Sequence, residues 1–327
     1  MEQMQRFLSP SLFRMLGATG DTWNLPNYDG ALYTASDTET ALLRIIGGLN
    51  GGLQTNNFEF PTASLYVLPN PSQPEISETD SETAPAASHV ARTQEKNVTQ
   101  IFQEAINVTY AKLSNAGRLS GINTAGSSNN VASETNFQIA RKLDKVAKDV
   151  NWTFHNGTYQ ISTAANVANK TRGMFELIST LTQVDAQGAE LSKPLMDSLL
   201  LAMYDAGAIF SNVIIFTNGY QKQKISSLYT VLPQSRNVGG QNIQQIITDF
   251  GNLGIQLDRD VPSNKLGFYE VSQIAPVFQP VPEKGNLFFE PLAKTGAAEK
   301  SQLFGQIGLD HGPAFMHGAL VNLSTGA

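Results

Sequence analysis

Residues 97–113, NVTQIFQEAINVTYAKL, decide how the chain is to be interpreted. This segment is rich in Val, Ile, Thr and aromatic residues, which favour an extended strand. A Gly-, Ser- and Asn-rich break follows at 117–130, and then a charged segment with helical spacing at 133–154. The turn dipeptide Asn-Gly at 156–157 and the run NKTRGM at 169–174 complete the stretch. One extended segment that leads into one long, charged, isolated helix suggests a structural lever rather than a ligand pocket.

The helix predicted at 133–154 has one narrow apolar face. Ser133 is suited to the N-cap, and Glu134 in the first turn complements the positive end of the helix dipole. Apolar residues recur at steps of three and four: Phe137, Ala140, Leu143, Ala147, Val150 and Phe154. The basic residues lie mostly off this face: Arg141, Lys142, Lys145 and Lys148. Asp144 and Asp149 are interleaved with them, so we expect a solvated or protein-contacting face rather than a phosphate-binding one.

Before residue 97 the sequence predicts an arm followed by a hairpin. Residues 1–56 are apolar but interrupted by Pro and Gly, so this piece is too short and broken to form a domain. One short helix is predicted within it, at 38–46. A strand at 58–68 then leads into a Pro-rich, acidic stretch without apolar anchors at 69–87. We expect either the tip of a protruding hairpin there or a flexible linker.

The third quarter of the chain has the pattern of a separate compact domain in which helices and strands are mixed. Helices are predicted at 191–206 and 221–229, and strands at 212–216, 243–250, 253–257 and 265–271. Asn218-Gly219 is predicted to turn the chain between a strand and a helix. From residue 274 the chain returns to strand character, with strands at 287–292 and 303–309, a polar turn at 294–301, and a closing segment at 314–323.

The composition favours a protein that contacts other protein. Charged residues make up 15% of the 327 residues, against about 25% in an average globular domain. A surface poor in charge and rich in Asn, Gln, Ser and Thr suits extensive protein contacts, because charged residues are depleted at the centre of interfaces. The net charge of −6 argues against a broad basic face that binds nucleic acid.

Nothing in the sequence indicates export or a membrane. Because the chain has no cysteine, disulfides, thiolate zinc sites and cysteine nucleophiles are excluded. The start of the chain lacks the basic and apolar regions of a signal peptide, and no stretch reaches the roughly 18 apolar residues of a membrane helix. We therefore expect a soluble chain that is made in the cytoplasm.

No constellation of residues predicts catalysis, a cofactor or a metal. The motifs GxSxG, GxGxxG and GxxxxGK[ST] do not occur. His311 and His317 could share one face of a strand, but the adjacent Asp310 would point to the other face, so a third metal ligand is missing. Asp258 and Asp260 fall in an expected turn before a proline, where Asp is common. We therefore expect structural histidines, no catalytic residue, no cofactor-binding residue and no metal site.

Several segments, in this order, resemble the major capsid proteins of tailed bacteriophages with the HK97 fold, in particular the SU10-like family. They are NVTQIFQEAINVT at 97–109, the helix at 137–150 followed by NG, KTRGM at 170–174, TDFGNLGIQLDRDVPSNK at 248–265, LAKTG at 292–296 and GQIGLDHGPAFMHGALVNL at 305–323. Their order and spacing carry the resemblance over most of the chain.

The resemblance implies an α+β protein with an HK97-like capsid fold. This fold has an N-terminal arm, an extended β-hairpin loop, a peripheral domain with a long spine helix, and an axial domain. The resemblance places the arm at 1–57, the extended loop at 58–96, the first part of the peripheral domain at 97–172 with its spine helix at 133–154, the axial domain at 173–273, and the second part of the peripheral domain at 274–327.

The function implied by the resemblance is structural, not enzymatic. Such subunits self-assemble, as pentamers and hexamers, into the icosahedral head shell that encloses phage double-stranded DNA. The implied partners are a separate scaffolding protein, a portal protein, and packaged DNA contacted on the inner face without sequence specificity; a decoration protein is an open option, and no membrane is involved. The implied location is the virion, after assembly in the cytoplasm of the host bacterium. No Lys–Asn pair stands out, so no covalent cross-link is predicted.

Three other classes of protein remain open at this point. An encapsulin-like nanocompartment shell would share the fold but would need a cargo enzyme. A monomeric α+β binding protein or enzyme would need a ligand pocket with converging polar groups. A phage tail or decoration protein would be expected to lack a long charged helix between two β segments.

Overall fold

A computed structural model describes residues 38–68, 70–84, 87, 89–114, 134–178, 182–229, 232–238, 241–294 and 296–325. The predicted arm up to residue 37 and the predicted break at 117–130 lie outside these residues. The chain divides into two compact units. Unit 1 comprises Met1–Asp37, Glu104–Asp144 and Phe289–Leu303, and unit 2 comprises Thr38–Gln103, Lys145–Phe288 and Phe304–Ala327.

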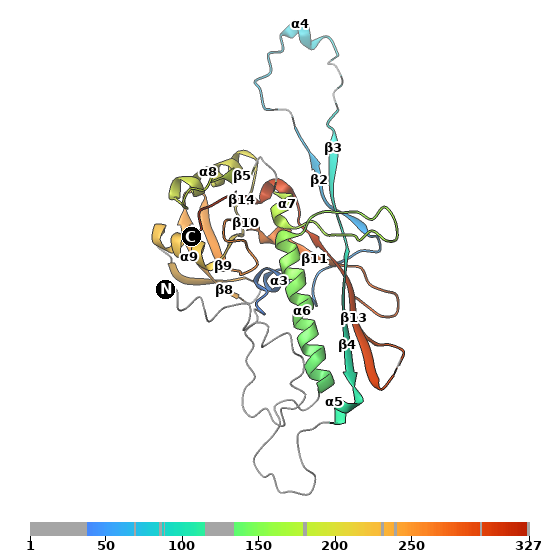
Figure 1. The fold of residues 1–327 in the computed structure, drawn as a ribbon. Coiled ribbons are helices and arrows are strands. Elements are labelled where there is room, and N and C mark those ends of the chain that lie inside the picture. Colours follow the sequence, from blue (N-terminus) through green and yellow to red (C-terminus); the bar gives the residue numbers. More distant parts are fainter. Residues whose placement is uncertain are drawn as a thin grey trace. The chain divides into compact units, whose positions relative to one another are not determined.

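Helices and strands are mixed along the described chain, as expected for an α+β protein (Figure 1). The helices are α3 (Ala41–Ile45), α4 (Glu78–Ser81), α5 (Tyr110–Ser114), α6 (Glu134–Asn156), α7 (Met174–Leu177), α8 (Lys193–Asp205), α9 (Gly219–Leu228), and the 3-10 helices η3 (Val271–Gln273) and η4 (Ala314–Met316). The strands are β1 (Leu53–Gln54), β2 (Glu59–Tyr66), β3 (Arg92–Val98), β4 (Gln100–Thr109), β5 (Gln183–Asp185), β6 (Val213–Thr217), β7 (Leu232–Val238), β8 (Gln241–Thr248), β9 (Gly251–Leu257), β10 (Leu266–Glu270), β11 (Ala275–Phe278), β12 (Leu287–Pro291), β13 (Ala298–Asp310) and β14 (Gly318–Val321).

The larger sheet of unit 2 has seven strands in the order β5-β14-β10-β6-β9-β8-β7. Its central strand β6, with the sequence VIIFT, is buried along its whole length, as the β-branched run predicts. β6 pairs in parallel with β9 and antiparallel with β10. α8 packs on β14 and β5 and buries Met196, Leu199, Leu200 and Met203 in the core of this sheet (Figure 1). One face of a helix and one face of a sheet therefore form the first core of unit 2.

The long helix predicted at 133–154 is α6, which runs two residues further. In unit 2 its residues Val146, Val150 and Phe154, at steps of four, are buried in a second core. This core also contains residues of α3, α7 and strands of both sheets. The predicted apolar face is wrong at one turn, because Val146 is buried whereas Leu143 is 39% exposed. Residue spacing identifies a face of a helix, but it does not say which turns other elements cover.

β2 and β3 form a two-stranded antiparallel hairpin with α4 at its far end (Figure 1). Among the described residues of this hairpin, only those at its root are buried, through Phe60, Asn97 and Val98. At the far end, Ser77 and Asp80 form a capping box that starts α4. The first of the two alternatives predicted for the acidic stretch, a protruding hairpin, is therefore the observed one.

The smaller sheet has the order β1-β11-β13-β12, and β4 also pairs with β13. β13 begins at Ala298, five residues before the strand predicted at 303–309, so the predicted polar turn at 294–301 is too long. Residues 299–302 are polar, yet the backbone N–H of Leu292 donates to the carbonyl oxygen of Lys300 at 2.8 Å. Backbone pairing extends this strand where the side chains alone suggest a turn.

The connection predicted at Asn218-Gly219 between a strand and a helix is shorter than expected, because Gly219 is already the first residue of α9. Asn218 is the N-cap of α9, and its side chain accepts a hydrogen bond from the backbone N–H of Gln221 at 3.0 Å. The helix therefore begins two residues before the one predicted at 221–229. Asn favours both turns and helix N-caps, so this dipeptide alone does not distinguish the two.

The described part of unit 1 holds the start of α6, α5 and the ends of three strands. The backbone N–H of Tyr110, at the start of α5, donates to the carbonyl oxygen of Ala297 at 3.0 Å. Lys142 on α6 pairs with Glu104 on β4 at 2.9 Å. Among the described helices of both units, none combines the length and apolar character that a membrane crossing requires.

Candidate interaction surfaces and buried polar sites

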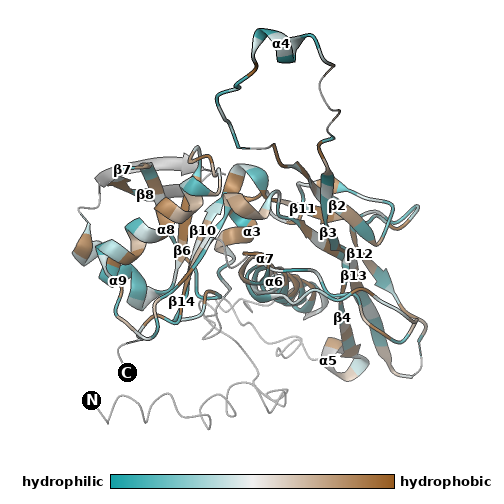
Figure 2. Ribbon diagram, turned by 90° about the horizontal axis from the view of Figure 1, so that it is seen from above, coloured by the Kyte–Doolittle hydropathy of each residue, from teal (hydrophilic) through white to brown (hydrophobic). Residues whose placement is uncertain are grey.

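The far half of the hairpin β2–β3 exposes both apolar and acidic side chains. Its exposed apolar residues are Tyr66, Val67, Leu68, Ile76 and Val90. Its exposed acidic residues are Glu75, Glu78, Asp80 and Glu82. Figure 2 shows the largely hydrophilic far end around α4 and the more apolar strand ends that lead to it. Apolar side chains exposed on a projection with a polar rim are typical of a surface that another protein covers.

The basic side chains of α6 are paired with carboxylates. The pairs are Arg141–Asp144 at 3.0 Å, Lys142–Glu104 at 2.9 Å, Lys145–Asp149 at 2.8 Å and Lys148–Asp260 at 2.9 Å. The helix thus presents a face of mixed charge rather than a basic stripe suited to phosphate. The prediction made from the interleaved aspartates is confirmed.

A polar cluster, which we call the Asp258 cluster, is buried between α6 and the loop that follows β9. Asp258 is fully buried, and its Oδ2 lies 3.2 Å from Nε2 of His155. The amide of Asn151 donates to the same oxygen at 3.2 Å, and the backbone N–H of Asp260 donates to Oδ1 at 2.9 Å. Burial alone would raise the pKa of Asp258, but the bond and charge of His155, the Asp260 N–H and the Asn151 amide lower it to about 2. The buried carboxylate is therefore ionised.

The Asp258 cluster also caps the short helix α3. The backbone N–H of Leu42 donates to Asp258 Oδ2 at 3.2 Å, and that of Leu43 donates to Asn151 Oδ1 at 3.0 Å. Thr40, the N-cap residue itself, makes no side-chain hydrogen bond to the helix. Because the first N–H groups of a helix lack partners within it, side chains distant in sequence supply them here.

Tyr269 completes a Tyr–His–Asp series that resembles a catalytic relay. Its hydroxyl lies 3.3 Å from Nδ1 of His155, whose Nε2 faces Asp258. Burial and then the charge of Asp258 raise the pKa of Tyr269 well above its ordinary value, so the hydroxyl stays protonated. All three side chains are fully buried, so no substrate reaches them. The series joins elements of the fold, and sequence reasoning missed it because each residue lies in an unremarkable local context.

The two histidines, predicted to be structural, do not lie on one strand, although their spacing allowed it. His311 follows β13 and His317 precedes β14, and both side chains are fully buried. His317 Nε2 lies 2.7 Å from the carbonyl oxygen of His311, and the backbone N–H of Glu270 donates to His317 Nδ1 at 3.2 Å. Both nitrogens of His317 thus hold backbone groups, which is a structural role. Within the described ranges, no group of three or more His, Cys, Asp or Glu side chains could hold a metal ion.

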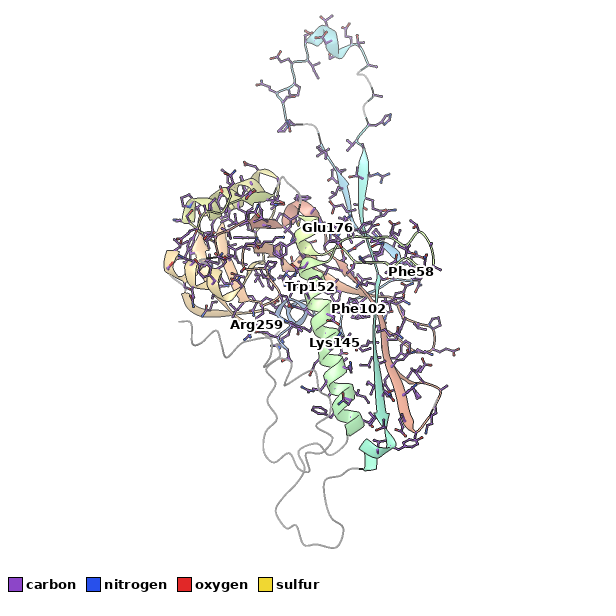
Figure 3. All side chains as sticks on the ribbon, viewed as in Figure 1. Phe58, Phe102, Lys145, Trp152, Glu176 and Arg259 are labelled. Atoms are coloured by element: carbon purple, nitrogen blue, oxygen red, sulfur yellow. The ribbon has the colours of Figure 1, made fainter. Side chains whose placement is uncertain are left out.

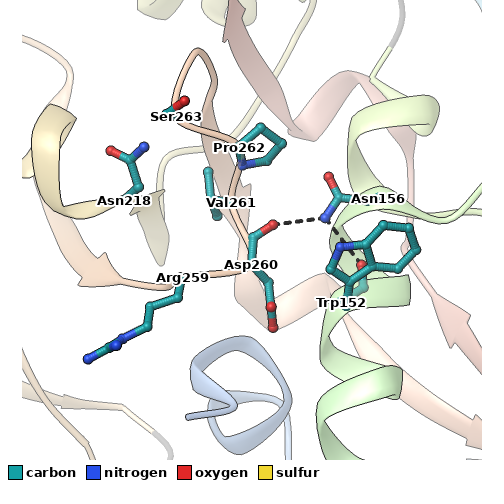
Figure 4. A pocket seen from close by; sticks show the side chains of 8 residues that line it. All are labelled: Trp152, Asn156, Asn218, Arg259, Asp260, Val261, Pro262 and Ser263. Atoms are coloured by element: carbon teal, nitrogen blue, oxygen red, sulfur yellow. Dashed lines mark hydrogen bonds between the residues drawn. The ribbon is translucent and has the colours of Figure 1, made fainter. Parts of the chain in front are cut away.

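Two hollows of unit 2 lie beside Trp152, a side chain that is 53% exposed (Figure 3). The smaller, of about 440 Å³, lies against Asn156 and the loop 259–263. There the amide of Asn156 donates to the carbonyl oxygen of Asp260 at 2.8 Å (Figure 4). The larger, of about 980 Å³, is also lined by Phe58 and the loop after α6. Aromatic residues are enriched at protein–protein interfaces. The exposed ring of Trp152 beside both hollows is therefore a candidate contact for another protein.

Solved structures with the same fold are shells. The capsid of Cyanophage A-1(L) superposes with a TM-score of 0.59 at 14% identity, covering 94% of this chain and 99% of that one. The capsid of a native GTA particle gives 0.56 at 12% identity, covering 94% and 98%. The SrpI encapsulin of Synechococcus elongatus PCC 7942 gives 0.54 at 10% identity, covering 97% and 96%. At these identities the similarity shows the fold alone, which is the HK97-like fold.

The particular family follows from the sequence. The model of the SU10 major capsid protein family matches residues 15–324, so the chain belongs to that family. No curated protein matches the chain. The chain is therefore a structural major capsid protein that self-assembles into the shell of a bacteriophage virion, and it is not an enzyme. The predicted family, α+β fold and structural function are confirmed.

Proposed function

We propose that this chain builds the head shell from rings of five and six subunits around packaged double-stranded DNA. The observation that carries the proposal is the hairpin β2–β3, whose far half exposes Val67 and Ile76 beside acidic residues. Head-to-tail contacts that close into rings can tile a shell. A subunit held by several neighbours gains effective concentration, so modest contacts add up to a stable shell.

The roles of the segments follow from this proposal. The arm would be 1–57, the extended loop 58–96, the peripheral domain 97–172 with its spine helix and 274–327, and the axial domain, near the ring centres, 173–273. Support comes from the hairpin β2–β3, from the length of α6 and from the strands β6, β8, β9 and β10, which share one sheet.

The proposed partners are those of a shell that is filled with DNA. A separate scaffolding protein would set the curvature, a portal protein would occupy one vertex, and a decoration protein is an option for the outer face. The inner face would contact DNA without sequence specificity and without a broad basic surface, because the net charge of the chain is −6. Assembly would take place in the cytoplasm of the host bacterium.

Electron microscopy with sedimentation tests the proposal. The purified chain, alone and co-expressed with the scaffolding protein of its phage, is examined for closed shells and for rings of five and six. Closed shells or such rings are the expected result. A chain that stays monomeric when concentrated with its scaffolding partner would contradict the proposal, and shells formed by the chain alone would contradict the need for a scaffold.

An encapsulin-like compartment is the second candidate, favoured by the fold shared with the SrpI encapsulin. The contents of particles purified from infected cells separate the two. Double-stranded DNA supports the phage head, whereas a single enriched enzyme without DNA supports the compartment.

A further inference from the structure

The hairpin β2–β3 contains a bend at a defined residue. Pro61 pairs with Lys96 and Ala63 pairs with Glu95, so Thr62 is an extra residue on β2. A bulge of this kind disrupts the ladder locally, bends the strand and re-aims a side chain. The bend therefore lies immediately beyond the buried root of the hairpin.

The root of the hairpin is held by contacts with β13 and with the segment before α7. The ring of Phe60 lies against Gly308 on β13, where an added Cβ would come within 2.8 Å of it. The amide of Asn97 donates to the carbonyl oxygen of Leu309 at 2.7 Å. Its Oδ1 accepts from the backbone N–H of Arg172 at 2.8 Å. Any movement of the hairpin must therefore begin at the bulge and not at the root.

Two contacts hold the hairpin to the loop after β13, at the bulge. Thr62 Oγ1 lies 3.3 Å from Nε2 of His311, and Glu95 accepts from the backbone N–H of Ala314 at 3.2 Å. Nδ1 of His311 lies 2.7 Å from the carbonyl oxygen of Gly312, so that nitrogen carries the proton. In the neutral ring, Nε2 then accepts from the Thr62 hydroxyl.

His317 holds this loop in place through its neutral form. Its Nε2 donates to the carbonyl oxygen of His311, and its Nδ1 accepts from the backbone N–H of Glu270. A second proton, on Nδ1, would face that N–H and break the hydrogen bond. Protonation of His317 would therefore loosen the segment that carries both hairpin contacts.

We propose that Thr62, Glu95, His311 and His317 form a proton-sensitive latch on the hairpin, and that acid frees the hairpin beyond Thr62 while its root stays attached. The consequence for assembly rests on the proposed function, because a hairpin that changes its angle can reach neighbours in rings of different size. The latch itself is a property of the single chain.

Charged and titratable groups face the latch from each element around it. They are Glu59 and Lys96 on the hairpin, paired at 3.1 Å, Arg172 before α7, Asp310 at the end of β13, Glu270 at the end of β10 and Tyr269, whose ring lies edge-on to His317 at 6.3 Å. The Glu270 carboxylate already accepts from the backbone N–H groups of Ser211 and Asn212. The charge of Arg172 reaches both Glu95 and His311.

As the pH falls, the charge of the groups around the latch becomes more positive. Burial lowers the pKa of His317 to about 4; burial, with the charges of His317 and Arg172, lowers that of His311 to about 4 as well. Burial raises the pKa of Glu95 and of Asp310. In acid the two carboxylates lose their negative charge and the histidines gain positive charge beside Arg172. Protonation of the histidines opposes the latched state, whereas protonation of Glu95 and Asp310, whose pKa values are raised, partly offsets this effect.

Hydrogen–deuterium exchange of the full-length, unassembled chain tests the latch at about pH 7 and about pH 4.5, with rates corrected for intrinsic exchange. Peptides that cover 62–68 and 89–95 are expected to lose protection in acid. Peptides from the root at 97–103 and from α6 are expected to keep it. Equal protection of the hairpin at both pH values, or loss of root and α6 protection together with it, would overturn the proposal.

Three variants sharpen this experiment. Thr62→Val lacks the hydroxyl, so hairpin exchange at neutral pH is expected to be about two- to tenfold faster. His317→Gln can donate to His311 and accept from Glu270 without titrating, so its acid response is expected to shrink. His89→Gln removes an exposed histidine of the same hairpin and should behave as the unaltered chain. If Thr62→Val leaves exchange unchanged, the latch is wrong whether or not shells form, because electron microscopy scores assembly separately.

Discussion

At the scale of single residues, Asp258 accepts hydrogen bonds from several buried donors. Its carboxylate accepts from Leu42, Asn151, His155 and Asp260. Asp258→Ala would leave these buried donors unpaired, so we expect the free energy of unfolding to fall by about 3–5 kcal/mol. Urea denaturation followed by circular dichroism measures this change.

Asp149→Ala is the matched control for that prediction. Asp149 pairs with Lys145 on the same helix, but both side chains are about half exposed, at 48% and 51%. Exposed pairs contribute little, so the change should stay within about 0.5 kcal/mol. A similar loss in both variants would show that the Asp258 cluster has no special role in stability.

His317 gives the stability of the fold a pH dependence with a definite sign. Its pKa is lowered from 6.5 to about 4 in the folded chain. Between these two pH values His317 is therefore mostly protonated in the unfolded chain and mostly neutral in the folded chain. Stability from the neutral ring is complete above pH 6.5 and is lost as the pH falls toward 4. The full shift corresponds to about 3 kcal/mol.

His317→Gln isolates this effect. Glu95 and Asp310 have raised pKa values and add stability in acid, but both chains contain them, so they cancel in the comparison. We expect the variant to be slightly less stable than the unaltered chain at about pH 7 and more stable at about pH 4.5. Unfolding curves at both pH values check this, and a difference that does not change with pH would contradict it.

At the scale of elements, local sequence was sufficient wherever local forces decide the structure. α6, α8 and β6 were predicted because residue spacing and β-branched runs act within a few residues. The Asp258 cluster was not predicted, because His155 and Asp258 are 103 residues apart in the chain. Asp258 was interpreted as a turn residue, which describes its backbone but not its partners. Only the folded chain brings these partners together.

Close packing between β13 and the hairpin yields a prediction about Gly308. A Cβ at this position would lie 2.8 Å from the Phe60 ring and 2.9 Å from the carbonyl oxygen of Val98. The backbone oxygen cannot move aside as a flexible side chain could, so Gly308→Ala should cost about 1–3 kcal/mol. Thermal unfolding measures the loss, and hydrogen exchange at the hairpin root locates it.

Gly219→Ala is the control for that substitution. Gly219 begins α9, has no heavy atom within 4 Å of an added Cβ, and does not have a positive φ. Alanine should be tolerated there or should slightly stabilise the helix, by up to about 1 kcal/mol. If Gly308→Ala were equally well tolerated, the hairpin root would not be packed against β13 as described.

At the scale of the whole molecule, stability and assembly depend on different parts of the chain. None of the described residues between 67 and 90 belongs to the two cores of unit 2. We therefore expect that replacing residues 67–91 with an Asn-Gly turn leaves the fold intact, since Tyr66 and Arg92 already lie opposite each other in the hairpin. Circular dichroism and a melting curve should match those of the unaltered chain.

The same shortened chain is expected to lose shell assembly, because the exposed apolar and acidic side chains of the hairpin would no longer reach a neighbour. Negative-stain electron microscopy with sedimentation, under conditions in which the unaltered chain assembles, measures this loss. Ser77→Ala is the control: it removes the cap of α4 but keeps the length and charge of the hairpin, so it should still form shells. Shells of normal size from the shortened chain would show that other contacts suffice to hold subunits together. Failure of both variants would instead point to the capped conformation of the tip, rather than its reach, as the feature that a neighbour binds.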